Sequence, residues 1–263
     1  MSNPSLRYYA CGQTRHDLSQ VFKGRAKEVR VFPAGVFLFE HENGERVLFD
    51  TGYAPTMEGS GLGGALYRRL LPPEVTPSGT IDRQLARDGI SPSSIGRVVL
   101  SHLHPDHIGG VRYFPDAQFI MSQGMMTTLA APKMKEGVIR KLLPEWFIDA
   151  NKVIIEDQPS TQAYEGMQGY DVFNDGSYVV VDLPGHANGH LGAYVLSRAV
   201  LAGDAAWGND LLGCANDMRA LPKAVNHDMS SYQATAQHLE SLRDQGVALY
   251  FSHDTYDKKD LIG

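Results

Sequence analysis

The chain has 263 residues, 43% of them apolar, and its 24 basic and 30 acidic side chains give a net charge of −6. This apolar content excludes a disordered chain, and the lack of a basic excess argues against nucleic acid as a partner. Cys11 and Cys214 lie far apart in the chain, which excludes a disulfide framework. We interpret Cys214 as a small, buried apolar residue.

The N-terminus lacks the apolar segment of a signal peptide. No window approaches the roughly 18 consecutive apolar residues of a membrane span. We therefore expect a cytoplasmic protein with no membrane partner. The sequence carries no coiled-coil heptads, so it does not indicate an oligomeric state.

The first half of the chain alternates polar segments with short strands. Residues 1–27 are polar and irregular, so we expect a surface arm. Two short strands are predicted within 29–41, followed by a tight turn at 42–44 whose Asn and Gly tolerate positive φ. A return strand then covers 46–49. The Gly- and Pro-rich segment 53–78 is predicted to be a long excursion around a short helix at 62–71.

The second half adds further strands and two helical regions. A helix is predicted at 81–88, and a helical region broken by two prolines at 123–149. A long amphipathic helix is predicted at 230–243, with Asp228 as its N-cap. Short strands are predicted at 97–100, 118–121, 153–155, 170–173, 178–183, 191–196, 199–201 and 247–251. We predict one α+β domain spanning 1–263, in which two sheets pack together and helices cover their outer faces.

The strongest chemical signal is a cluster of imidazoles and a carboxylate directly after the predicted strand at 97–100. It reads His102-x-His104-x-Asp106-His107. Imidazole nitrogen and carboxylate oxygen are natural ligands of zinc and similar ions. Four such groups within six residues predict a metal site rather than a polar turn. Pro105 restricts the loop and lowers the entropy lost on binding.

Further donors follow other apolar strands. His186 comes after 178–183, Asp204 after 199–201 and His253 after 247–251. Each has a small residue directly before it. A single histidine in such a place is usually a hydrogen-bonded or surface residue, but the shared position at strand ends favours convergence on one site.

The motifs SHLHPDH, LPGH, AGD and SH, preceded by LFDTG, resemble those of the metallo-β-lactamase-fold hydrolases. They occur in family order over most of the chain. The resemblance implies a four-layer αβ/βα sandwich. It also implies two divalent ions, with His102, His104 and His186 on the first, Asp106, His107 and His253 on the second, and Asp204 bridging both.

The same resemblance assigns two supporting residues. Asp50, in the LFDTG turn, is similar to the carboxylate that orients a ligand histidine in this family; a plain turn residue is the alternative. We interpret His190, in the Gly-His-x-x-Gly-His pattern, as structural. A histidine at position 104 favours hydrolysis over the oxygen chemistry of the di-iron branch, which typically has a carboxylate there.

We expect zinc in both sites, with iron, manganese or cobalt as alternatives. Metal binding lowers the pKa of water, so a metal-bridging hydroxide would attack a small ester-type substrate. A lactone or thioester is the expected substrate, and it would be partly apolar. Asp106 and Asp204 are candidates for accepting the proton of the attacking water. The alternatives are a small-molecule phosphodiesterase and a weakly catalytic, metal-bound ligand sensor.

The overall motif set resembles the N-acyl-homoserine lactone lactonase branch, with one departure. That branch typically has a tyrosine three residues after the bridging aspartate, whereas this chain has Trp207. Indole can donate a hydrogen bond but cannot deliver a proton. Tyr53 and Tyr67 are candidate substitutes in the substrate pocket.

The segments 53–78 and 123–149 are predicted to border that pocket. Apolar side chains between positions 121 and 147 are candidates for the wall of this pocket, and an ordinary helical core is the alternative. These side chains are Met121, Met125, Met126, Met134, Trp146 and Phe147.

Overall fold

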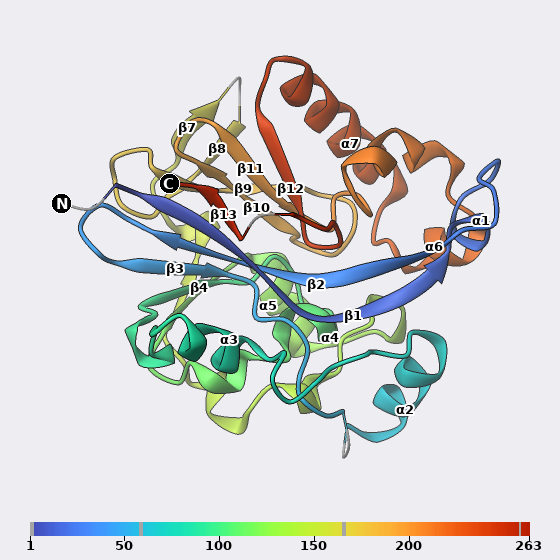
Figure 1. Ribbon diagram of the computed structural model, residues 1–263, viewed down its shortest axis with the longest axis horizontal. Helices are drawn as coiled ribbons and strands as arrows, with labels where there is room; N and C mark the ends of the chain where they lie inside the picture. Colours follow the sequence, from blue (N-terminus) through green and yellow to red (C-terminus); the bar gives the residue numbers. More distant parts are fainter. Residues whose placement is uncertain (1–2, 58–59, 165–166, 258) are drawn as a thin grey trace.

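The computed structural model describes residues 3–57, 60–164, 167–257 and 259–263. Positions 1–2 of the predicted arm, positions 58–59 of the predicted excursion and the side chain of Met134 lie outside the described part of the chain. Two mixed β-sheets lie face to face in the centre of the molecule, and helices cover their outer sides (Figure 1). This is the α+β sandwich that the sequence predicted.

The first sheet has seven strands in the order β13-β1-β2-β3-β4-β5-β6. The strands from β3 to β6 run parallel to one another, whereas β13, β1, β2 and β3 are paired antiparallel. The bounds are β1 Ser5–Asp17, β2 Val29–Glu40, β3 Arg46–Phe49, β4 Arg97–Val99, β5 Gln118–Met121, β6 Lys152–Ile154 and β13 Asp260–Ile262.

The second sheet has six strands in the order β12-β11-β10-β9-β8-β7, and only its β11–β12 pair is parallel. The bounds are β7 Thr161–Tyr164, β8 Met167–Asp171, β9 Tyr178–Asp182, β10 Leu191–Val195, β11 Ala199–Gly203 and β12 Ala248–Phe251.

The α-helices lie mainly outside the two sheets. In Figure 1, α3, α4 and α5 lie on one side of the first sheet and α7 lies on the outer side of the second. Their bounds are α1 Leu18–Val21, α2 Gly61–Leu70, α3 Ile81–Arg87, α4 Pro105–Ile108, α5 Gln123–Ala130, α6 Ala220–Val225 and α7 Met229–Asp244. The 3-10 helices are η1 Pro92–Ser94, η2 Val111–Tyr113, η3 Met134–Glu136, η4 Arg140–Leu142, η5 Glu145–Ile148, η6 Ile155–Asp157 and η7 Asn209–Asp217.

The alternation of side chains along β9 explains why the second sheet has a packed layer on each face. Val180 belongs to the core cluster between the sheets, whereas Val179 and Val181 pack in a second cluster with the buried face of α7, including Leu239 and Leu242. Because successive side chains of a strand point to opposite faces, a strand that is apolar throughout can hold a layer on each side.

Asp228 caps α7 as expected, since its carboxylate accepts hydrogen bonds from the backbone N–H groups of Ser230 and Ser231. The turn after β2 and the strand at 118–121 are also confirmed.

Three predictions of local structure were wrong. About half of the expected N-terminal arm is β1, a 13-residue strand paired along nearly all of β2. The segment 29–41 holds one long strand instead of two short ones, because Pro33 sits in the ladder opposite Gln13 where β1 bulges. In 123–149 the α-helix ends at Ala130, and short 3-10 turns follow. The strands β7 and β13 were not predicted.

The expected apolar wall also packs differently. Met121, Met125 and Phe147 are buried in the core cluster, and Met126 and Trp146 pack against it. This favours the ordinary core that the sequence left open. Cys214 is only partly buried, contrary to the prediction, and its Sγ lies 3.1 Å from a guanidinium nitrogen of Arg25.

Candidate metal centre

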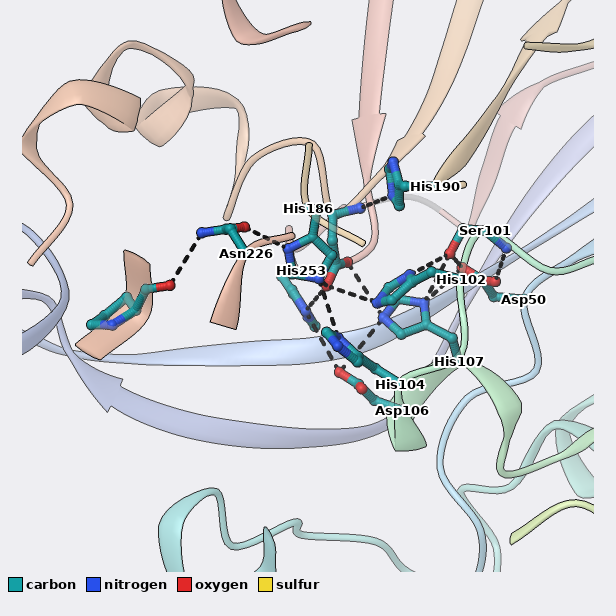
Figure 2. A network of polar contacts seen from close by, with 12 residues as sticks. Asp50, Ser101, His102, His104, Asp106, His107, His186, His190, Asn226 and His253 are labelled. Carbon is teal, nitrogen blue, oxygen red and sulfur yellow. Dashed lines mark hydrogen bonds and ion pairs between the residues drawn. The ribbon is translucent and has the colours of Figure 1, made fainter. Parts of the chain in front are cut away.

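The predicted donors all follow strands that end at one edge of the sandwich. His102 and His104 lie between β4 and α4, and Asp106 and His107 form the first turn of α4. Because β11 and β12 are parallel, their ends meet at the same edge and bring Asp204 and His253 together. His186 arrives from the loop after β9. Figure 2 shows the side chains of the six labelled donors pointing toward one another: His102, His104, Asp106, His107, His186 and His253.

The donors form two groups, within each of which one ligand atom per residue lies within 4.8 Å of the others. The first group contains His102, His104, His186 and Asp204; the second contains Asp106, His107 and His253. In the first group His186 Nε2 is 3.2 Å from His104 Nδ1. In the second, Asp106 Oδ2 is 3.6 Å from Nε2 of both His107 and His253.

Asp204 lies between the two groups. Its Oδ2 is 3.3 Å from His186 Nε2 and 3.0 Å from His253 Nε2, and its Oδ1 is 3.4 Å from His107 Nε2. The carboxylate therefore faces imidazoles of both groups. This is the geometry that a bridging ligand requires.

Polar partners fix the orientation of three rings. The outer Nδ1 of His107 lies 2.7 Å from Asp50 Oδ2, that of His186 lies 3.0 Å from Asn226 Oδ1, and that of His253 lies 2.7 Å from the backbone oxygen of Pro33. Each Nδ1 faces an acceptor and so carries the hydrogen, which in the neutral ring leaves the Nε2 lone pair directed into the site.

Some inward-facing atoms are buried without a hydrogen-bond partner in the part of the chain that the structure describes. They are His102 Nε2, His107 Nε2 and Asp204 Oδ1. Buried polar atoms normally have partners, and leaving one unpaired costs about 1–3 kcal/mol. A cation between these lone pairs would satisfy all three, so the residues present fit divalent metal ions.

Asp50 organises the outer layer of the site. Its carboxylate accepts hydrogen bonds from the backbone N–H and the hydroxyl of Ser101, both at 2.7 Å, as well as from His107. Since the Ser101 hydroxyl donates to Asp50, it accepts from His102 Nδ1 at 2.9 Å. Asp50 thus orients one ring directly and a second through Ser101.

His190 lies fully buried beneath the site. Its Nδ1 donates to the backbone oxygen of Leu183 at 2.8 Å, and its Nε2 accepts from the backbone N–H of Asp204 at 3.1 Å. The ring therefore holds the backbone at Asp204.

Burial and neighbouring charges shift the pKa values of the site residues in different directions. Burial and the neighbouring His107 lower the pKa of His102 well below its usual value. Burial alone would lower the pKa of His107 too, but Asp204 and Asp50 outweigh it and raise that pKa well above 6.5. Burial would raise the pKa of Asp204, yet His253 and His107 hold it well below its usual range. Asp204 is therefore a carboxylate at neutral pH.

Of the three pocket candidates, the two tyrosines lie together and the tryptophan lies elsewhere. The hydroxyls of Tyr53 and Tyr67 lie 2.9 Å apart. Burial, and then Asp106, raise both tyrosine pKa values well above 10, so both side chains stay protonated. Trp207 packs edge-on against Phe32, with ring centroids 5.1 Å apart, and its ring is 6.3 Å from that of His253.

A small recess adjoins the first donor group, and its volume of about 10 Å³ has room for about one water molecule. His104 and His186 line one side of it, and 123–149 contributes Thr128, Lys135 and Val138. That segment therefore borders the recess through residues other than the methionines and aromatics that were expected there.

Sequence reasoning missed Ser101, Asn226 and Pro33 as supports of the ligand rings. Ser101 directly precedes the histidine cluster and could have been noticed there. Asn226 lies 40 positions after His186, and the Pro33 contact uses a backbone atom. Neither leaves a signal in the sequence.

Comparison with known proteins assigns the family. The model of the metallo-beta-lactamase superfamily matches residues 29–249. A probable metallo-hydrolase of Mycobacterium tuberculosis is 28% identical over 235 residues, covering 83% of this chain and 74% of that protein. The N-acyl homoserine lactonase AiiB of Agrobacterium fabrum is 27% identical over 226 residues, covering 82% and 78%.

Solved structures share the fold. A quorum-quenching N-acyl homoserine lactone hydrolase superposes with a TM-score of 0.70 at 21% identity, covering 98% of this chain and 96% of that one. AidC, a dizinc quorum-quenching lactonase, gives a TM-score of 0.69 at 16% identity, covering 99% and 90%.

The sandwich and its histidine–aspartate cluster define a metal-dependent hydrolase. The chain belongs to the metallo-beta-lactamase superfamily, and in its sequence it is similar to the lactonases of that superfamily. No helix in the described ranges is both long enough and apolar enough to cross a bilayer.

Proposed function

We propose that this hydrolase opens a small ester-type substrate, a lactone or a thioester, at a site of two divalent metal ions, with zinc as the expected metal. The observation that carries this proposal is the position of Asp204. Its two oxygens approach His186 and His107, which belong to different donor groups. Similarity to named N-acyl homoserine lactonases supports the ester class of substrate.

Each group would hold one ion, with His102, His104 and His186 on the first, Asp106, His107 and His253 on the second, and Asp204 shared. Two bound cations supply a nucleophile from water at neutral pH and withdraw charge from the substrate carbonyl. Asp106 and Asp204 are the two carboxylates of the donor set, and either would accept the proton of the reacting water.

The hydroxyls of Tyr53 and Tyr67 replace the tyrosine that lactonases carry after the bridging aspartate. Both stay protonated and their hydroxyls pair with each other, so one donates to the other and the second is left to donate a hydrogen bond to a substrate oxygen. Trp207 supplies an apolar wall beside His253.

The test is turnover by metal-loaded protein of three substrate types: a lactone, a thioester and bis-p-nitrophenyl phosphate. We expect turnover of the lactone or the thioester and loss of that activity in His104→Ala, with the fold retained by circular dichroism. Turnover of the phosphodiester alone would replace the proposal with a phosphodiesterase. Turnover of none, despite bound metal, would favour a ligand sensor.

A further inference from the structure

His16, near the end of β1, lies beside the second donor group. Its ring centroid is 5.7 Å from that of Phe32 and 5.6 Å from that of Trp207. Those two rings are in turn 6.4 and 6.3 Å from His253. His16, Phe32 and Trp207 therefore form one aromatic group, and two of its rings approach His253. His16 also precedes residue 29, where the match to the superfamily begins.

Pairing of β1 with β2 sets this position. Thr14 is opposite Phe32 in the ladder, and His16, two residues on, points to the same face. The next residue of β2, Pro33, accepts the hydrogen bond from His253. The strands therefore present His16 toward the side of the site where His253 and Asp106 lie, and the ribbons of β1 and β2 pass beside these residues in Figure 2.

One ring nitrogen of His16 is available. Nε2 lies 3.2 Å from the Thr14 hydroxyl, whereas Nδ1 has no hydrogen-bond partner among the described residues. The ring is half-buried. With one nitrogen fixed by Thr14, the other can be directed at a polar atom of a ligand.

The charged groups around His16 are few. Asp106 on α4 and His253 after β12 act on it electrostatically. Its cross-strand neighbour Arg30 is engaged by Glu28 and Asp210. Burial and then His253 lower the pKa of His16 below 6.5, while Asp106 opposes them. A lowered pKa makes the protonated ring a stronger acid, which favours proton transfer to a basic oxygen.

We propose that His16 donates a proton to the leaving oxygen of the ester, a role that rests on the proposed function. As the oxygen of water bonds to the carbonyl carbon, the C–O bond to the leaving group breaks and its electron pair stays on the leaving oxygen. The proton on Nδ1 of protonated His16 moves to that oxygen. Solvent then reprotonates the ring, while Nε2–H donates to Thr14.

Such a donor matters only for a poor leaving group, and this gives a sharp test. A lactone and a thiolactone of the same ring size differ in this respect, because an alkoxide is far more basic than a thiolate. For His16→Gln we expect kcat/KM to fall on the order of 10²-fold on the lactone and less than about threefold on the thiolactone. The matched control is His238→Gln on α7, which we expect to behave as wild type on both substrates.

Two measurements separate proton donation from a structural role. Bound metal and the thermal midpoint of His16→Gln should equal those of wild type. Added imidazole should restore lactone turnover to His16→Ala without affecting wild type. Equal losses on both substrates, or no loss on either, would overturn the role of His16 and leave the proposed function standing. If the wild-type protein hydrolyses neither the lactone nor the thiolactone, both proposals are overturned.

Discussion

Individual hydrogen bonds decide how the donors of this site are aimed. Asp50 has a left-handed backbone, with φ of 63°, and is fully buried. Its two oxygens serve three donors from Ser101 and His107. An uncommon backbone conformation and a complete set of partners together indicate that the position is required for orienting the rings.

The variant Asp50→Asn tests this requirement because it removes the charge and keeps the size of the side chain. An amide offers one acceptor instead of two, so either His107 or Ser101 loses its partner. We expect affinity for zinc to fall roughly 10- to 100-fold, measured by competition with a chromogenic chelator. Asp182→Asn, at an exposed position on β9, is the control and should leave affinity unchanged. Unaltered affinity in Asp50→Asn would show that the ring orientations do not depend on this carboxylate.

At the scale of elements, the loop that carries the histidine cluster is seated against the segment after β3. Gly109 and Gly110 follow α4 directly, and their backbones touch that segment. The backbone N–H of Thr51 donates to the His107 carbonyl at 2.8 Å. This close approach sets the distance between Asp50 and the ligand loop.

Gly109→Ala should therefore destabilise the fold. A Cβ at this position would lie 1.9 Å from the backbone nitrogen of Ala54, which cannot move cheaply. We expect a loss of about 1–3 kcal/mol in the free energy of unfolding, measured with denaturant. Gly96→Ala is the control, because nothing lies within 4 Å of its added Cβ; its effect should stay within about 0.5 kcal/mol. A similar loss in both variants would contradict the argument from backbone contact.

A second contact between elements links the two sheets away from the site. His41, just after β2, has its Nε2 2.8 Å from Asp175 Oδ2 and stacks on Phe173 with ring centroids 4.1 Å apart. Burial alone would lower the pKa of His41, but the hydrogen bonds to Asn43 and Asp175 raise it above 6.5. The contact is therefore strongest with a charged ring.

This predicts a pH dependence with a defined sign. A raised histidine pKa stabilises the fold below the ordinary value of 6.5, and this contribution is lost as the pH rises through the folded-state pKa. The pKa of Asp175 is lowered by hydrogen bonds that outweigh its burial, so its contribution is lost in acid. Because Asp175 is 42% exposed, the effect should stay below about 1 kcal/mol.

The measurement is the difference in unfolding free energy between wild type and His41→Gln from pH 5 to about 9, by denaturant titration of metal-free protein. Wild type should have the larger free energy of unfolding at pH 5, and this difference from His41→Gln should disappear at alkaline pH. His227→Gln serves as the control. A difference that grows with pH would reverse the assigned sign.

Across the whole molecule, the donor set was predictable and much of the scaffold was not. The cluster at 102–107 is local, and the later donors share a recognisable position after apolar strands, so local patterns found them. By contrast, β1 is mostly polar in appearance, and only pairing with β2 gives buried positions to Tyr9 and Cys11. The same tertiary pairing brings His16 to the site, which no local pattern could indicate.

The separation of the donors along the chain makes metal binding a stabiliser of the complete fold. Residues from 102 to 253 contribute to the two groups, and an unfolded chain cannot bring them together. A ligand that binds only the folded state at 100 times its Kd adds about 2.7 kcal/mol. For a chain of this length that corresponds to a rise of roughly 5–10 °C in the thermal midpoint.

We therefore expect calorimetry to give a higher midpoint for zinc-loaded protein than for protein dialysed against a chelator. Asp204→Asn is the informative variant, because it removes the shared carboxylate with little change in volume. It should lose most of the zinc-induced rise while retaining a cooperative transition. If wild type unfolds at the same temperature with and without zinc, the donors do not hold metal in the folded chain. If Asp204→Asn keeps the full rise, the ions bind independently of the residue proposed to join them.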